Sequence, residues 1–196
     1  MRSLLAVLGA VIASSGAIPY IIDTIKGKTH PNIVTWVTYT LINCINAVAA
    51  LQAGATSTAL FSGIGVLALG CITITAIKHG VRKYTLFDIT CQILAVAGII
   101  VWRATGSPGA AVAIVLCVFM LASLPTWRHS WIAPQAETWE GFVIGAAGSI
   151  LTLASLPSPS FVGLAYPTAV IINNLTIASI ILSRRKTLAG RRTQSV

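Results

Sequence analysis

The chain has 196 residues, of which 56% are hydrophobic and 9% are charged, and its mean hydropathy is +0.86. Soluble globular domains carry about 25% charged residues, so this composition excludes an ordinary soluble domain and indicates a protein that lies in a lipid bilayer. Thirteen Lys and Arg oppose four Asp and Glu, which gives a net charge of +9. Because five of these bases follow Ser183, we interpret the basic charge as a signal of membrane topology and predict no nucleic-acid partner.

Three uncharged or nearly uncharged intervals each have the length of one membrane span. A helix needs about 20 apolar residues to cross a hydrocarbon core of about 30 Å. Residues 3–22 and 104–127 meet this requirement without any charge. Residues 84–102 form a weaker third candidate, because they contain Asp88 and Gln92; the sequence leaves the role of Asp88 open.

Two longer uncharged intervals each predict a pair of spans. Residues 29–77 have twice the required length, and their middle carries a small and polar turn at 53–58. Residues 141–183 are interrupted at 155–160, where two prolines in three residues cannot continue a buried helix. The sequence therefore predicts an all-α membrane protein with seven transmembrane helices.

The distribution of bases predicts the orientation of these spans. With the N-terminus outside, eleven Lys and Arg fall on the inner side, and Arg2 and Arg103 alone fall on the outer side. This bias predicts a cytoplasmic C-terminus and, with the short loops, a bacterial plasma (inner) membrane. An alternative for the first span is a cleaved signal peptide, since Arg2 precedes a short apolar run and the small residues Ser15, Gly16 and Ala17.

An internal repeat divides the chain. The pattern Pro-x-x-x-Thr-Trp occurs at residues 31–36 and again at 134–139, and a proline precedes each copy, at Pro19 and at Pro125. Two further spans follow each copy, so the chain reads as three helices, one linker helix and three helices. The predicted parts are a first three-helix repeat at 3–78, a linker helix at 84–102, a second three-helix repeat at 108–183 and a basic cytoplasmic tail at 184–196.

This arrangement resembles the PQ-loop superfamily, which includes the SWEET and SemiSWEET sugar transporters. The shared features are the 3+1+3 order of helices, the external N-terminus and a proline near the end of the first helix of each repeat. In that family the proline belongs to a Pro-Gln pair, whereas here Tyr20 and Thr126 follow the prolines. The resemblance implies that Pro19 and Pro125 are hinges for rocking between outward-open and inward-open states.

Polar side chains inside the spans are candidates for a solute site, because they tend to face the bundle interior. In the second span Tyr39, Asn43 and Asn46 share one helical face with Thr35, at about 100° per residue. Amides and aromatic rings suit a neutral polyhydroxylated solute, although the same amides also serve as bonds between helices. The predicted substrate-binding residues are Tyr39, Asn43, Asn46, Tyr166, Asn173 and Asn174.

Aromatic and acidic residues gather near the predicted inner ends of the spans. Trp36 and Trp139 are typical of interfacial anchors. We interpret Glu137 and Glu140 as acids at a helix N-terminus, where the helix dipole stabilises negative charge. An alternative role for the aromatic residues is an inner gate, formed by Tyr20, Trp36, Trp127 and Trp139.

These observations predict a transporter that moves a small neutral polar solute, sugar-like in chemistry, by alternating access. The expected partners are this solute and the lipid bilayer; a monomer suffices for a pathway, and homo-oligomers are left open. No metal or cofactor is predicted, and the four scattered acids argue against a membrane enzyme. The alternative is a membrane receptor or scaffold that binds a peptide or protein, since the same fold resembles the KDEL receptor.

Overall fold

The computed structural model describes residues 1–31, 33–80 and 86–193, and over these ranges the chain is helical and has no strand. A Gly16 turn separates the first two helices, and a 3-10 turn, η1, precedes α7. The elements are α1 (Arg2–Ser15), α2 (Ala17–Ile25), α3 (Ile33–Gln52), α4 (Thr56–His79), α5 (Leu86–Thr105), α6 (Pro108–Ile132), η1 (Pro134–Ala136), α7 (Trp139–Ser155) and α8 (Phe161–Thr193).

Several helices are long and apolar enough to cross a bilayer, as the composition predicts. Among the described residues there are five such segments: Arg2–Ile25, Ile33–Gln52, Thr56–His79, Pro108–Ile132 and Phe161–Gly190. Helix α7 is a shorter apolar helix of 17 residues. The helices therefore fit an integral membrane protein.

The breaks between helices follow the local sequence. The predicted turn at 53–58 coincides with the end of α3 and the start of α4, where Gly54 adopts a φ of 71° that only glycine takes without strain. The Ser107 side chain accepts a hydrogen bond from the Ala110 N–H and so caps α6, with Pro108 at its first position. The proline-rich interval at 155–160 separates α7 from α8.

Two helices extend beyond the predicted spans. Helix α6 continues to Ile132, five residues past the predicted limit at residue 127. Helix α8 continues through the basic residues to Thr193, so residues 184–193 are helical and continuous with the last predicted span. This segment contains Lys, Arg, Leu and Ala, which favour helix, and no proline.

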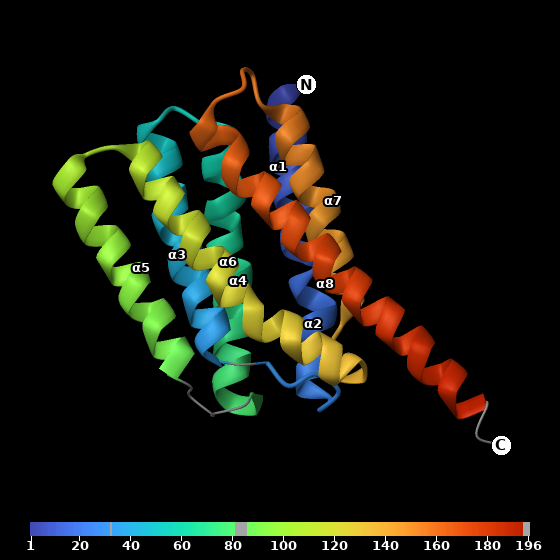
Figure 1. Ribbon diagram of the computed structural model, residues 1–196. Coiled ribbons are helices and arrows are strands. Elements are labelled where there is room, and N and C mark those ends of the chain that lie inside the picture. The colour runs from blue at the N-terminus through green and yellow to red at the C-terminus, as the bar shows by residue number, and fades with distance from the viewer. Residues whose placement is uncertain (32, 81–85, 194–196) are drawn as a thin grey trace.

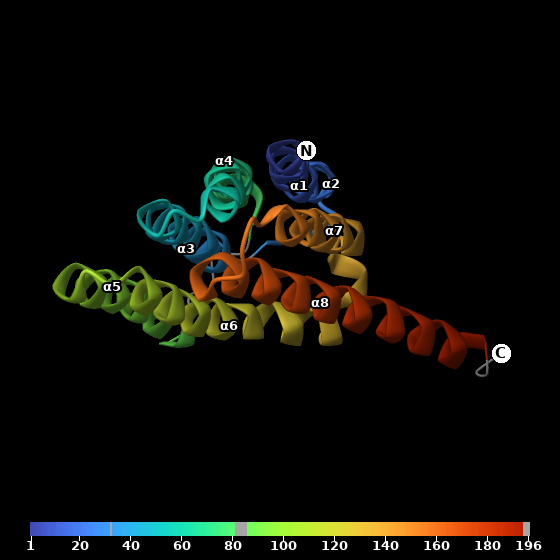
Figure 2. The ribbon, with the colours of Figure 1, turned by 90° about the horizontal axis from the view of Figure 1, so that it is seen from above.

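Among the described residues, the five membrane-length segments and the shorter helix α7 form a ring. Helix α4 packs between α1/α2 and α3, and α8 packs between α6 and α7. The ring closes where α1 packs against α7 and where α3 packs against α6, while α5 lies outside against α6 and α3 (Figure 1; Figure 2). We call the end of the bundle that holds Met1 the N-terminal end and the opposite one the C-terminal end (Figure 1).

Glycines allow α1 and α7 to approach closely. A Cβ atom at Gly16 would lie 2.5 Å from the carbonyl oxygen of Gly141, and one at Gly9 would lie 2.7 Å from the Thr152 nitrogen. A Cβ atom at Gly148 would overlap the backbone of both Ala13 and Gly9. In an apolar solvent such contacts between small residues stabilise helix pairs through van der Waals packing.

We predict that Gly148→Ala destabilises the protein, because the obstructing atoms are backbone atoms that move only with their helix. The expected loss is about 1–3 kcal/mol, measured as a lower apparent Tm in detergent. Gly63→Ala is the matched control, since no atom lies within 4 Å of a Cβ there. Equal Tm values for the two variants would show that the α1–α7 contact is not tight.

Candidate functional site

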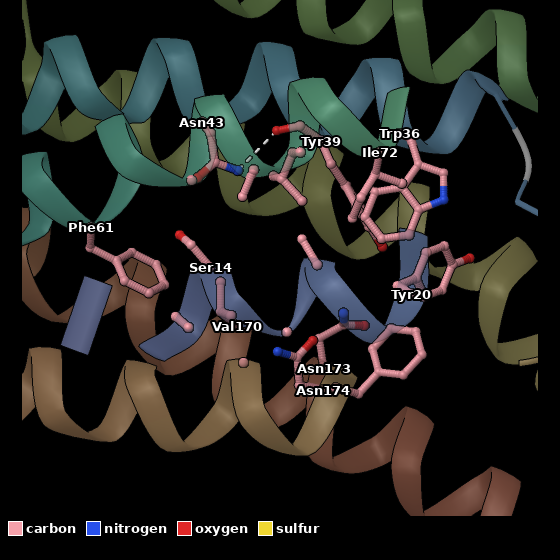
Figure 3. A pocket seen from close by; sticks show the side chains of 18 of the residues that line it. Ser14, Tyr20, Trp36, Tyr39, Asn43, Phe61, Ile72, Val170, Asn173 and Asn174 are labelled. Carbon is pink, nitrogen blue, oxygen red and sulfur yellow. Dashed lines mark hydrogen bonds between the residues drawn. The ribbon is translucent and has the colours of Figure 1, made fainter. Parts of the chain in front are cut away.

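A cavity of about 120 Å³ lies inside the ring, between the helices of the first and the second half of the chain. Figure 3 shows side chains converging on it from opposite sides, with Asn43 on one side and Asn173 and Asn174 on the other. None of its lining residues is Asp, Glu, Lys or Arg. The polar side chains that line it are Ser14, Tyr20, Trp36, Tyr39, Asn43, Tyr166, Asn173 and Asn174.

Aromatic rings narrow the cavity toward the C-terminal end. The rings of Tyr20 and Trp36 lie 4.7 Å apart between centroids, and Phe142 meets Tyr20 edge-on at 6.2 Å. Tyr20 and Trp36 come from the first half of the chain and Phe142 comes from the second. The rings therefore join the two halves.

A second aromatic group lies nearer the N-terminal end. The Tyr166 ring lies 5.6 Å from that of Phe119 and 6.3 Å from that of Phe61. Tyr39 also contacts Phe119, with a centroid distance of 5.3 Å. Pairs with these offset and edge-on geometries each stabilise by about 0.5–1.5 kcal/mol beyond the area they bury, so the cavity has rigid aromatic walls.

Hydrogen bonds fix the polar side chains of α3. Asn43 donates from Nδ2 to the Tyr39 carbonyl at 2.9 Å and to the Tyr166 hydroxyl at 2.7 Å. The Tyr39 hydroxyl lies 2.8 Å from Oγ of Ser123, which itself donates to the Phe119 carbonyl. The bond from Asn43 to Tyr166 and the bond between Tyr39 and Ser123 cross from the first half of the chain to the second. Asn43 and Tyr39 therefore join the halves and also line the cavity.

The two neighbouring asparagines of α8 differ in their partners. Asn173 is buried and accepts a hydrogen bond from Trp127 Nε1 at 2.8 Å. The Asn174 side chain has no hydrogen bond to any residue that the structure describes, and it lines the cavity. The donors and the acceptor of the Asn174 amide are thus without a partner among the described residues.

Glycines make room for two of the amides. A Cβ atom at Gly65 would lie 2.8 Å from Oδ1 of Asn43, and one at Gly145 would lie 2.5 Å from Nδ2 of Asn174. Each amide therefore lies flat against the neighbouring helix of its own half. No local sequence signal predicts this role, because it depends on the side chain that faces each glycine in the fold.

Three predicted site residues lie away from the cavity lining. Asn46 is fully buried and donates to Ser62 at 2.7 Å, so it joins α3 to α4 and matches the structural interpretation of these amides. Trp127 acts through its bond to Asn173, and Trp139 packs against the core cluster. The remaining predicted residues, Tyr39, Asn43, Tyr166, Asn173, Asn174, Tyr20 and Trp36, line it.

The two predicted hinge prolines lie at irregular points of their helices. Pro19 has no N–H to bond the Ser15 carbonyl, and the chain turns at Gly16, between α1 and α2. Pro125 lies inside α6, which bends in its C-terminal third (Figure 1). The missing hydrogen bonds make both positions easier to bend than a regular helix.

Beyond the aromatic rings, the loop before α7 is held by polar contacts. Thr138 donates to Oδ2 of Asp23 at 2.8 Å, and its Oγ lies 2.8 Å from Oγ of Thr29. Glu137 is 5% exposed, and its Oε1 lies 2.8 Å from Nδ1 of His129. The sequence placed Glu137 only as an acid near a helix N-terminus, because its burial depends on α6 and α8.

Among the described residues, no three His, Cys, Asp or Glu side chains gather in a way that could hold a metal ion. Comparison with family models, curated proteins and solved structures finds no match for this chain. The cavity and the residues around it are therefore the features of the molecule that indicate its function.

Burial raises the pKa of Glu137 above its ordinary value of 4.5, and the hydrogen bond from His129 opposes this shift only in part. A raised pKa means that the folded protein binds this proton more tightly than the unfolded chain does. The resulting stability is fully present below about pH 4.5 and is lost as the pH rises through the folded-state pKa.

We therefore predict that Glu137→Gln raises the apparent Tm relative to wild type at pH 8 by roughly 2–4 °C, and that the difference shrinks toward pH 5. Thermal unfolding across this pH range checks it. Glu140→Gln, at an exposed acid three residues along the chain, is the control and is expected to change little. A difference independent of pH would mean that Glu137 ionises as freely in the folded protein as in the unfolded chain.

Proposed function

We propose that this protein is a membrane transporter that moves a small neutral polar solute by alternating access. The observation that carries the proposal is the uncharged polar and aromatic cavity that lies between the two halves of the chain. Its walls combine amides with rings, the combination that recognises hydroxyl-bearing solutes through hydrogen bonds and apolar faces. Aromatic rings narrow it toward the C-terminal end, and polar contacts close that end outside them.

The packing of the helices supports a 3+1+3 arrangement of seven spans. In the first half the third helix, α4, packs between the other two, and in the second half α8 does the same. Each half then contacts the other in an equivalent way, since α1 meets α7 and α6 meets α3. Two such halves related by pseudo-symmetry place a solute site between them, and α5 is the linker that joins them.

The positions of the bases support an external N-terminus and a cytoplasmic C-terminus. Arg2 and Arg103 lie at the N-terminal end of the bundle. Lys26, Lys78 and Arg128 lie toward the C-terminal end, as does the basic part of α8. In a bacterial plasma membrane the C-terminal end would face the cytoplasm by the positive-inside rule.

The dimensions of the cavity limit the solute. Sites for drug-sized ligands occupy about 300–1,000 Å³, whereas this cavity has about 120 Å³. That is less than the cavity of about 150 Å³ that accepts benzene in an engineered protein. In this conformation the site suits a solute smaller than a benzene ring, and a monosaccharide requires an expanded state.

The first experiment is a thermal-shift screen of the purified protein against monosaccharides, polyols, nucleosides, vitamins and amino acids. A solute that binds the folded state raises the apparent Tm in a saturable way. The compound found is then tested for flux into proteoliposomes. A flat screen together with no flux of any tested compound would contradict the transporter proposal and favour a receptor or scaffold.

We predict that Asn174→Ala lowers the affinity for this solute about tenfold or more, because the Asn174 amide has no protein partner in the described structure and its hydrogen bonds are made to the solute. The protein should keep its Tm. Thr75→Ala, at a half-buried threonine of α4 that bonds the Cys71 carbonyl of its own helix and does not line the cavity, is the control and should leave affinity unchanged. Unchanged affinity in the Asn174 variant would remove this residue from the site.

A separate prediction concerns Pro125. In Pro125→Ala the new N–H bonds the Leu121 carbonyl and stiffens α6 where the proline now permits bending. We expect solute exchange in proteoliposomes to slow about tenfold, while the dissociation constant changes less than about twofold. Parallel losses of binding and exchange would show that Pro125 shapes the site and is no hinge.

A further inference from the structure

Two titratable side chains hold the start of α7 in equivalent ways. Asp23 follows Pro19 by four residues and accepts a hydrogen bond from Thr138. His129 follows Pro125 by four residues and bonds Glu137. The two helices that carry the hinge prolines therefore bond the adjacent residues Glu137 and Thr138, just before α7. This segment lies at the end of the bundle that opens in the proposed rocking motion.

Glu137 is the unusual member of this group. Its side chain is 5% exposed, and Oε1 lies 2.8 Å from Nδ1 of His129. Its other oxygen, Oε2, is buried and accepts no hydrogen bond from any residue that the structure describes. A buried carboxylate oxygen without a partner is costly when the group is charged, and a bound proton removes that charge.

The groups that face Glu137 come from three helices. His129 of α6 bonds the carboxylate, and the Tyr20 hydroxyl of α2 lies close enough to interact electrostatically with it. Arg185 of α8 donates to the backbone carbonyls of Glu137 and Pro134, at 2.8 and 3.0 Å, and does not bond the carboxylate. The carboxylate thus lacks a full counter-charge, because His129 is neutral in part of the pH range and Arg185 is engaged elsewhere.

Tyr20 connects Glu137 to the cavity. Its ring lines the cavity and contacts Trp36 and Phe142, while its hydroxyl points away from Asn173 and Asn174 (Figure 3). Any movement that separates the halves at the C-terminal end must part Tyr20 from Phe142 and Asp23 from Thr138. The same movement would admit water to Glu137, because Glu137 directly precedes Thr138 and lies near the Tyr20 hydroxyl.

We propose that Glu137, paired with His129, is a proton-binding site that keeps the cavity closed toward the C-terminal end while the proton is bound. The proton comes from water at the C-terminal end, binds the carboxylate and returns to the same water when the end opens. This inference rests on the proposed alternating access, because it assigns a condition to one of its two gates. At acidic pH on that side the gate is closed, and at alkaline pH it opens more readily.

The direction of this pH dependence follows from the linkage between proton binding and the closed conformation. In the closed conformation burial raises the pKa of Glu137, whereas contact with water in an open conformation would return the pKa toward its ordinary value. The closed conformation therefore binds the proton more tightly than the open one. Protonation shifts the equilibrium toward the closed conformation by the same factor by which closure raises the proton affinity. His129 shifts the pH range in which this happens, since its hydrogen bond favours the charged carboxylate.

The test is a distance measurement between spin labels across the C-terminal end. Labels are attached at Lys28→Cys, in the loop after α2, and Gln135→Cys, in η1, both at exposed positions. The native Cys44, Cys71, Cys91 and Cys117 are replaced by Ser or Ala. Double electron–electron resonance spectroscopy of the protein in lipid nanodiscs then gives the distance distribution from pH 5 to pH 9, without any solute.

In the wild-type background we expect a population with a distance longer by roughly 5 Å or more to grow as the pH rises. Glu137→Gln carries a permanently neutral side chain and should stay at the short distance at every pH. Glu140→Gln removes an exposed acid from the first turn of α7 and should respond like wild type. His129→Leu removes a bond that favours the charged carboxylate, so the midpoint should move about one unit to higher pH.

Each other outcome overturns the inference. A distance that changes with pH equally in wild type and in Glu137→Gln would place the titrating group elsewhere and leave the transporter proposal intact. An unshifted midpoint in His129→Leu would show that the pair does not titrate as one site. If no long distance occurs at any pH, the proton site fails as a gate; if a bound solute also leaves the distance unchanged, alternating access itself is contradicted.

Discussion

The close contact between α1 and α7 closes the ring of helices, and the cavity depends on it. Four glycines, Gly9, Gly16, Gly141 and Gly148, let the two backbones meet without side chains between them. In an apolar solvent no hydrophobic effect drives helices together, so association relies on such packing and on hydrogen bonds between helices. A larger residue in this contact would move α1 away from α7, and with it the cavity wall that carries Ser14 and Tyr20.

Hydrogen bonds supply further connections between the halves, beside the aromatic contacts. At the level of the cavity, Asn43 bonds Tyr166 and Tyr39 bonds Ser123. Toward the C-terminal end Thr138 bonds Asp23. Side chains that join the halves at one depth also line the cavity. Under the proposed function, solute binding would therefore be coupled to the relative position of the halves, as alternating access requires.

Much of the architecture follows from the sequence, because charge-free length and helix-breaking residues act locally. The breaks near 53–58 and 155–160 are of this kind, and so are the bends at Pro19 and Pro125. The polar face of α3 also predicts residues of the cavity, namely Tyr39 and Asn43. Asn46 lies on the same face but bonds Ser62 of α4 instead. One amide is separated from the next by less than a helical turn, and only the rotation of α3 against its neighbours decides which of them meets the cavity.

The residues that the sequence did not reveal depend on partners distant in the chain. Nothing in the residues around Gly145 predicts that the Asn174 amide lies against it, 29 positions later. The burial of Glu137 arises in the same way, from His129 of α6 and Arg185 of α8. A polar residue beside a helix N-terminus is usually solvated, and here tertiary packing overrides that tendency.

The two amides against glycines come from non-equivalent helices of the halves. Asn43 belongs to the second helix of the first half, and Asn174 belongs to the third helix of the second half. The polar lining of the cavity therefore differs between its two walls. Under the proposed function, a hydroxyl-bearing solute has one preferred pose against these walls, and its enantiomer would present its hydroxyl groups to the wrong wall. Selectivity between enantiomers is then a consequence of the lining.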